Sequence, residues 1–431
     1  MANKMAMHKI EIAFIILALL FAYSTWAPAE EALTWEDCVR EAAKNNPDLI
    51  SAQEVIKQEK ATKFSTQSGL LPQVTGSVDA SRAETTSSVT SSTIKNSFSY
   101  GVDGTQLIFD GFQTLNDINA ATENEKAAKE NYRFISSEVR LNLRSAFVNL
   151  LKSQELINVA EDILRIRRSN LELITLSYVS GLEHRGALMT AEANAAQAKY
   201  ELAQAKRAVT FTQKQLAEQM GERDFRPMSV QGEFVVRDTA QEKPDFLEVI
   251  KTNPSILKAA ATKNAALFSK ISAIGSFAPE ITGTASAGRS GKSWVPKNNQ
   301  WNFGAALSMP IFEGGLKLAQ LSEADATYKK AVADEESTRN AAIVTLEQTW
   351  AALQDTIENV NVNYEILRAS EERAKISEAQ YSTGFITFDN WIIIQNDLVS
   401  AKKAYLQAEA NALTAEANWI QAKGETLEYA Q

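Results

Sequence analysis

The sequence contains very little cysteine and histidine. Among its 431 residues there are one cysteine and two histidines. A disulfide framework therefore cannot form within the chain, and a cysteine and histidine metal site is not expected. Only His184 lies outside the first thirty residues, so catalysis by histidine is not expected either. We predict no cofactor, no metal site, no catalytic residues and no enzyme activity.

Proline and glycine are also scarce, at nine and eighteen residues. Both interrupt regular structure, so their scarcity predicts long, uninterrupted elements. The formal net charge is −9, and this acidic balance argues against a nucleic-acid partner. Hydrophobic residues make up 45% and charged residues 23%, which are the proportions of an ordered chain.

Long apolar runs are absent apart from one near the N-terminus. Lys4 and Lys9 precede the apolar residues 10–21, and Ala27 and Ala29 form an A-x-A cleavage pattern. The pattern predicts a signal peptide at residues 1–29. The alternative is a membrane anchor, but a spanning helix needs about 20 apolar residues and this run is shorter. A mature protein embedded in a membrane would have to cross it by strands.

The chain contains an internal duplication. Asn46-Pro47 matches Asn253-Pro254, and Tyr178-x-x-Gly181 matches Tyr381-x-x-Gly384. The spacing between matched residues shortens by four within a Ser/Thr-rich stretch after residue 84, as expected for a loop. We predict one repeat at 30–221 and a second at 244–424, joined by a linker at 222–243 and followed by a short tail at 425–431.

Each repeat shows the same succession of patterns. Apolar residues alternate with polar ones on two segments, with aromatic residues near one end, as on tilted membrane strands; a hairpin in a soluble protein would show the same alternation. Proline ends helical character before each hairpin. We expect helices at 35–68, 113–179, 187–220, 244–276, 315–382 and 388–423, and strands at 71–82, 97–109, 279–289 and 300–312.

The longest segments follow a seven-residue repeat, which predicts left-handed supercoiled helices. In the first repeat its positions are Leu143, Leu150, Ile157, Leu164, Leu171 and Tyr178. A helix of this length spans on the order of 100 Å. The two shorter helices of each repeat, stacked end to end, would match it. The fold class is therefore mostly α with a small β part, a helical tunnel and a hairpin at one end of each repeat.

Four strands cannot close into a barrel, and open strand edges are not tolerated in lipid. Membrane-spanning hairpins would therefore require several chains. A dimer is the minimum, and a trimer would supply twelve strands.

Several segments together resemble the TolC-like outer-membrane efflux proteins, also called outer membrane factors. They are the opening LTWEDCVREA with NNPDL, the post-strand motifs QLIFDG and MPIFEGG, and the turns YVSGL and YSTGF. The resemblance covers nearly the whole mature chain. It implies a homotrimer in the outer-membrane lipid, with a twelve-strand transmembrane barrel, a tunnel through the periplasm and a closable inner end. The implied partners are a periplasmic adaptor (membrane fusion) protein and an inner-membrane pump of the RND, ABC or MFS type. Residues 222–243 would form a belt around the tunnel.

The turns depart from the family pattern. The family often has an acidic residue six positions after the turn glycine, and here those positions are Ala187 and Asn390. Asp389 is adjacent but would point about 100° away. The candidates for a periplasmic tip or gate are Glu183, His184, Arg185, Ala187, Asp389 and Asn390. The alternative is that the polar ones among them form exposed loops.

Two further sets of candidate residues follow from the patterns. Adaptor docking is assigned to Gly181, Leu182, Gly384 and Phe385, although the apolar second turn would also suit packing between hairpins. A membrane aromatic belt is assigned to Phe98, Tyr100, Trp301 and Phe303. The alternative is that these side chains face a neighbouring part of the barrel.

The predicted function is a passive exit duct for efflux or type I secretion. The alternative is a structural coiled-coil protein of the envelope. The sequence leaves open the cargo (drug, metal ion or protein), the pump class and the resting state.

Overall fold

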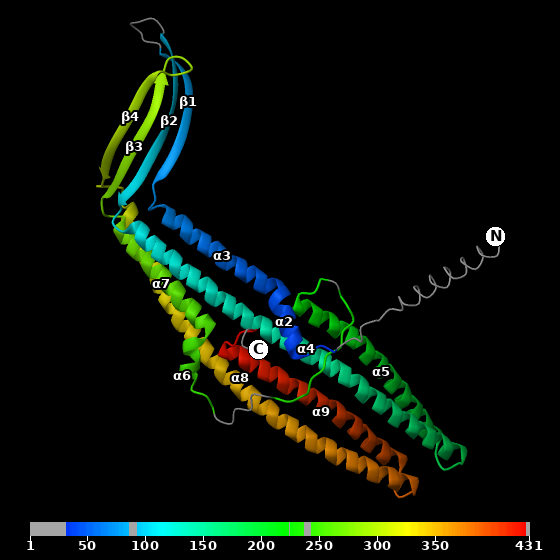
Figure 1. Cartoon of the computed structure of the whole chain (residues 1–431). Coiled ribbons are helices and arrows are strands. Elements are labelled where there is room, and N and C mark those ends of the chain that lie inside the picture. The colour runs from blue at the N-terminus through cyan, green and yellow to red at the C-terminus, as the bar shows by residue number, and fades with distance from the viewer. Residues whose placement is uncertain (1–31, 86–92, 224, 237–242, 428–431) are drawn as a thin grey trace, which may run out of the picture.

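The computed structural model describes residues 32–85, 93–223, 225–236 and 243–427. The predicted signal peptide lies outside the described residues. A curved sheet stands at one end of the molecule, and long helices run side by side from it to two turns at the other end (Figure 1).

The elements follow the same order in both halves, which confirms the duplication. The first half contains α2 (Trp35–Asn45), α3 (Pro47–Ser68), β1 (Gln73–Thr85), β2 (Thr93–Phe109), α4 (Gln113–Val179) and α5 (Arg185–Met220). The second contains α6 (Phe246–Val249), a 3-10 turn (Ile250–Thr252), α7 (Pro254–Gly275), β3 (Glu280–Gly291), β4 (Asn298–Ser308), α8 (Leu316–Ser382) and α9 (Phe388–Lys423). The mostly helical fold with a small sheet is the predicted one.

Some predicted bounds are wrong. The helix expected at 35–68 is broken at Asn46, and the one expected at 244–276 is divided in the same way before Pro254. In both cases the residue before proline is extended, because the proline ring disfavours a helical conformation there. The strand expected at 300–312 ends at Ser308, two residues before Pro310, which has no N–H to donate to a sheet.

At each break an asparagine joins two helix ends. The Asn46 side-chain oxygen accepts the N–H groups of Asp48 and Leu49 at the start of α3, at 2.9 and 3.3 Å. Its amide donates to the Gln219 carbonyl near the end of α5, at 2.8 Å. Unpaired groups of two helix termini are thereby satisfied by one buried side chain.

The second repeat builds the same joint. Asn253 accepts the N–H of Ser255 at the start of α7 and donates to the Ala422 carbonyl of α9, at 3.0 Å each. Each repeat is therefore one long helix beside two shorter ones that are stacked end to end.

The four strands form one antiparallel sheet in the order β1-β2-β3-β4. Directly opposed residues share a face, and the register gives rows such as Gly76, Val102, Ala287 and Trp301. The next row is Thr75, Asp103, Ser286 and Asn302. One face is consequently apolar and the other polar, and β1 and β4 are open edges.

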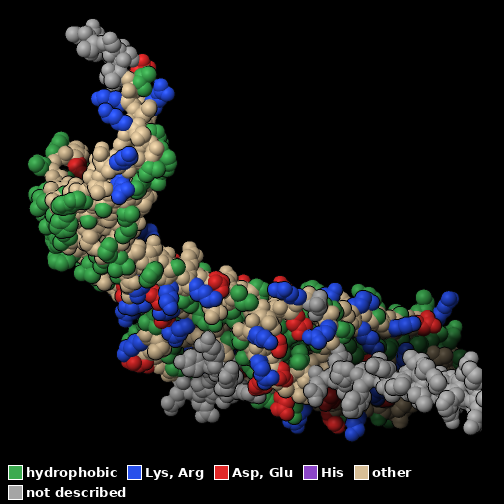
Figure 2. Space-filling view, turned by 45° about the horizontal axis from the view of Figure 1, so that its top comes forward, with side chains coloured by type: hydrophobic (Ala, Val, Ile, Leu, Met, Phe, Trp, Pro, Cys, Tyr) green, Lys and Arg blue, Asp and Glu red, His purple; other side chains and the backbone are tan. Residues whose placement is uncertain are grey.

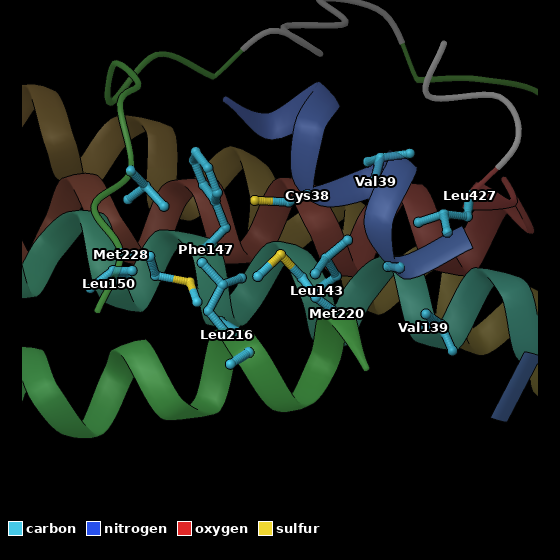
Figure 3. Close-up of a cluster of buried hydrophobic side chains, with 14 of the residues drawn as sticks. Cys38, Val39, Val139, Leu143, Phe147, Leu150, Leu216, Met220, Met228 and Leu427 are labelled. Atoms are coloured by element: carbon cyan, nitrogen blue, oxygen red, sulfur yellow. The ribbon is translucent and has the colours of Figure 1, made fainter. Parts of the chain in front are cut away.

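The main hydrophobic core lies at the middle of the shaft. Cys38 of α2, Leu143 and Leu150 of α4 and Leu216 of α5 are all completely buried, and their side chains point toward one another (Figure 3). Leu143 and Leu150 are positions of the predicted seven-residue repeat, which explains why α4 presents this stripe to its neighbours.

The segment after α5 crosses this core. Met228 and Val230 are buried in it, and the Val230 N–H donates to the Gln154 side-chain oxygen at 2.9 Å. The chain end joins the same cluster, since Leu427 is buried there and its N–H donates to the Ser136 hydroxyl at 3.0 Å. No helix within the described ranges is long and apolar enough to cross a membrane.

Candidate functional site

The two helix turns meet in a small hydrophobic cluster at the end of the shaft far from the sheet. Ile174 of α4 and Ala187 of α5 pack with Phe388 and Trp391 of α9, and all four are buried. The Trp391 ring stacks on Tyr381, with centroids 4.6 Å apart and planes within 5°. The apolar second turn thus packs against the first turn of the same chain, which is one of the two interpretations that the sequence allowed.

A hydrogen bond also connects the turns. The Tyr381 hydroxyl donates to the Glu183 carboxylate at 2.8 Å. Burial and the neighbouring carboxylate raise the pKa of Tyr381 well above its usual value, so the hydroxyl stays protonated and continues to donate.

The other polar candidates have local roles. The His184 ring nitrogen Nδ1 accepts the Ala187 N–H at 3.1 Å and caps the start of α5. Thr387 has the same position before α9, where its hydroxyl accepts the Asn390 N–H. Arg185, Asp389 and Asn390 are exposed. Ala187 is fully buried, so its side chain packs inside the chain and does not face a mouth.

The docking candidates form the outermost part of the turns. Gly181 and Gly384 have φ of 76° and 79°, and a Cβ at either position would meet nothing within 4 Å. Leu182 and Phe385 directly follow these glycines and are 80% and 82% exposed. The positive φ values reverse the chain, and open space surrounds both turns.

Polar contacts above the tip connect α9 to the first repeat. Arg167 donates to Asn396 at 2.6 Å, and Lys403 lies 2.7 Å from Glu201. Lys402 pairs with Asp162. These partners lie more than 200 positions apart, so no local pattern could reveal them.

All four residues predicted for an aromatic belt lie on the apolar face of the sheet. Trp301 and Phe303 are opposite Ala287 and Ala285, and both are more than 80% exposed. Tyr100 and Phe98 follow on β2, where Phe98 packs edge-on against Trp294 at 6.1 Å. Exposed hydrophobic side chains gather over the sheet in Figure 2. Such a surface is stable in lipid and costly in water.

A sheet with one apolar face, mounted on a shaft on the order of 100 Å long, is the arrangement of a protein that is anchored in a membrane by its strands and extends away from it. No group of three or more acidic, histidine or cysteine side chains in the described part of the chain could hold a metal ion. A family model described as "Outer membrane efflux protein" matches residues 38–222 and 248–425. The chain belongs to this family.

Known proteins agree with this assignment. The outer membrane efflux protein BepC of Brucella suis is 23% identical over 392 residues, which cover 89% of this chain and 83% of BepC. The cation efflux system protein CusC of Escherichia coli is 21% identical over 384 residues, covering 85% of this chain and 81% of CusC.

Solved structures share the fold. The CmeC outer membrane channel of Campylobacter jejuni superposes with a TM-score of 0.83 at 18% identity, covering 90% of this chain and 85% of CmeC. The open MtrE channel of Neisseria gonorrhoeae superposes with a TM-score of 0.79 at 19% identity, covering 91% of this chain and 89% of MtrE. The chain is thus an outer-membrane efflux channel that extends into the periplasm, as the resemblance predicted. The alternative of a purely structural envelope protein is not favoured.

Proposed function

We propose that three copies of this chain form a passive exit duct. The observation that carries the proposal is the sheet, which has an apolar face, a polar face and two open edges, β1 and β4. Pairing the β4 edge of one copy with the β1 edge of the next closes twelve strands, leaves no open edge in lipid and directs the polar face inward. The chain itself supplies no catalysis, and partner proteins supply the energy for transport.

The tip forms the closable end in this proposal. Tyr381, Glu183 and the cluster around Trp391 hold the α8–α9 turn against the α4–α5 turn. Opening moves one turn against the other, so it must weaken these contacts. The polar pairs between α9 and the first repeat add to the same resistance.

A periplasmic adaptor docks on the outer part of the turns, at Gly181, Leu182, Gly384 and Phe385. Two large apolar side chains exposed beside open space support this assignment. The adaptor connects the duct to an inner-membrane pump of the RND, ABC or MFS type. Residues 222–243, of which 224 and 237–242 lie outside the described residues, form the belt at mid-length, supported by the burial of Met228 and Val230 against α4. The names of BepC and CusC describe efflux, which supports efflux over protein secretion.

Single-channel recording tests the duct. Purified full-length protein, shown by heat-modifiable migration to be folded and trimeric, is added to a planar bilayer. Discrete conductance steps that disappear on heat denaturation are expected. Folded trimer that inserts and yet never conducts, even after the Tyr381 contact is removed, would contradict the duct.

A further inference from the structure

The basic residues of the sheet are distributed unevenly. All five that belong to the strands or to the β3–β4 loop lie toward the end farthest from the helices: Arg82, Lys95, Arg289, Lys292 and Lys297. We call them the outer basic cluster. Figure 2 shows blue side chains along this part of the sheet. The chain as a whole carries −9, so a basic end is not a consequence of composition.

The cluster begins where the aromatic side chains end. Arg289 is opposite Tyr100 on one side and Asn299 on the other, one row beyond Trp301. Lys292 follows Gly291, the residue opposite Phe98. Arg82 lies on the same face, whereas Lys95, opposite Ala83, lies on the polar face. Passing along the strands away from the helices, the apolar face therefore changes from aromatic to basic within a few residues.

The charges of the cluster are available to a partner. All five side chains are exposed, and none takes part in an ion pair within the described residues. Arg289 is held in place by its Nε–H, which donates to the Asn299 side-chain oxygen at 3.0 Å. That bond leaves the two terminal nitrogens of the guanidinium to bind an anion.

The position of the outer basic cluster indicates which anion it binds. The helices extend into the periplasm, so the opposite end of the sheet lies in the outer leaflet, and aromatic residues mark the boundary between hydrocarbon and headgroups. A cationic row immediately beyond that boundary faces the phosphate groups of the surrounding lipid, which attract Lys and Arg side chains.

We propose that the outer basic cluster binds the phosphate groups of lipopolysaccharide, the phosphorylated glycolipid of the outer leaflet. The aromatic side chains of the apolar face pack beside its acyl chains while Arg289, Lys292 and Lys297 contact its phosphates. The proposal rests on the outer-membrane location and does not require that the channel conduct.

The test measures binding of fluorescent diphosphoryl lipid A to the full-length trimer in detergent. The triple variant Arg289→Gln, Lys292→Gln and Lys297→Gln is expected to bind at least about tenfold more weakly, since it loses three phosphate contacts. Lipid A from which both phosphates have been removed is expected to bind the wild type as weakly as diphosphoryl lipid A binds the triple variant. The wild-type affinity should fall as salt is raised.

A variant with the same charge change on the helices, Lys57→Gln, Lys60→Gln and Lys251→Gln, is the control and should bind like the wild type. If the triple variant fails to form the heat-modifiable trimer, Arg82→Gln, which removes a cation from the apolar face, takes its place. Equal binding by variant and wild type, or by lipid with and without phosphate, overturns the proposal. So does complete displacement by an equal concentration of inorganic phosphate. Lipid binding by a trimer that never conducts would refute the duct and leave this inference standing.

Discussion

Tyr381 makes two different contacts with one side chain. Its ring stacks on Trp391 in its own hairpin, and its hydroxyl donates to Glu183 in the other hairpin. The sequence marks Tyr381 as the last position of the seven-residue repeat and Glu183 as a polar turn residue. It cannot predict their bond, because 198 positions separate them and only the packing of two hairpins brings them together.

Replacing Tyr381 with phenylalanine tests this bond. The variant keeps the stacked ring and loses a hydrogen bond to a carboxylate, a contact that contributes on the order of 1–2 kcal/mol when partly exposed. We expect more frequent or larger openings in planar bilayers. Tyr178→Phe is the control because Tyr178 holds the same place in the first repeat and is more exposed. Unchanged openings in Tyr381→Phe would show that the bond does not hold the tip closed.

Among the elements, the long helices were predictable and the breaks in the short ones were not. The seven-residue repeat in α4 and α8 records which side faces a neighbour, so it predicts both helix type and burial. The breaks depend on Asn46 and Asn253, whose partners Gln219 and Ala422 lie far along the chain. An asparagine before proline predicts only a local turn.

The joint between α5 and α3 can be tested with two glycines of the same backbone geometry. Gly221 and Gly181 both have φ of 76°, so alanine at either costs about 1 kcal/mol for the left-handed conformation. A Cβ on Gly221 would also lie 2.3 Å from the Asn45 carbonyl oxygen, whereas one on Gly181 meets nothing. We expect Gly221→Ala to cost about 1–3 kcal/mol more than Gly181→Ala.

Thermal unfolding of the two variants, followed by circular dichroism and by loss of the heat-modifiable band, gives the comparison. Equal unfolding temperatures for Gly221→Ala and Gly181→Ala would mean that the stacked helix ends separate easily, contrary to the close contact between Gly221 and Asn45.

In the whole molecule, the last described residues fasten the second repeat to the first. The Glu425 carboxylate lies 2.9 Å from Arg140 of α4 and 2.7 Å from Lys423. Burial alone would raise the pKa of Glu425, but these two cations outweigh it and lower the pKa below its ordinary value. The sequence predicted only a short tail here, since nothing local indicates which helix receives it.

This ion pair predicts a dependence of stability on pH. Because the folded pKa of Glu425 is lower than the unfolded value of 4.5, its stabilisation is present above about pH 4.5 and is lost as the pH falls through the folded pKa. Glu425→Gln should therefore unfold at a lower temperature than the wild type at pH 7, and the difference should be smaller at about pH 3, below the unfolded value. Glu248→Gln, which removes an exposed pair with Lys251, should change little at either pH. A difference for Glu425→Gln that is the same at both pH values would contradict the assigned charge.

The stacked arrangement of short helices also determines how force passes through the molecule. At the joints of Asn46 and Asn253 no covalent bond connects α5 to α3 or α9 to α7, because the chain leaves α5 for the linker and α9 for the C-terminus. Among the described helices, α4 and α8 run unbroken from the sheet to the tip, and each follows a strand, β2 or β4, after a short connection. A force applied to the turns is therefore transmitted to the sheet through two continuous helices per chain, α4 and α8. The stacked short helices beside them can slide or tilt once the hydrogen bonds of Asn46 and Asn253 are broken.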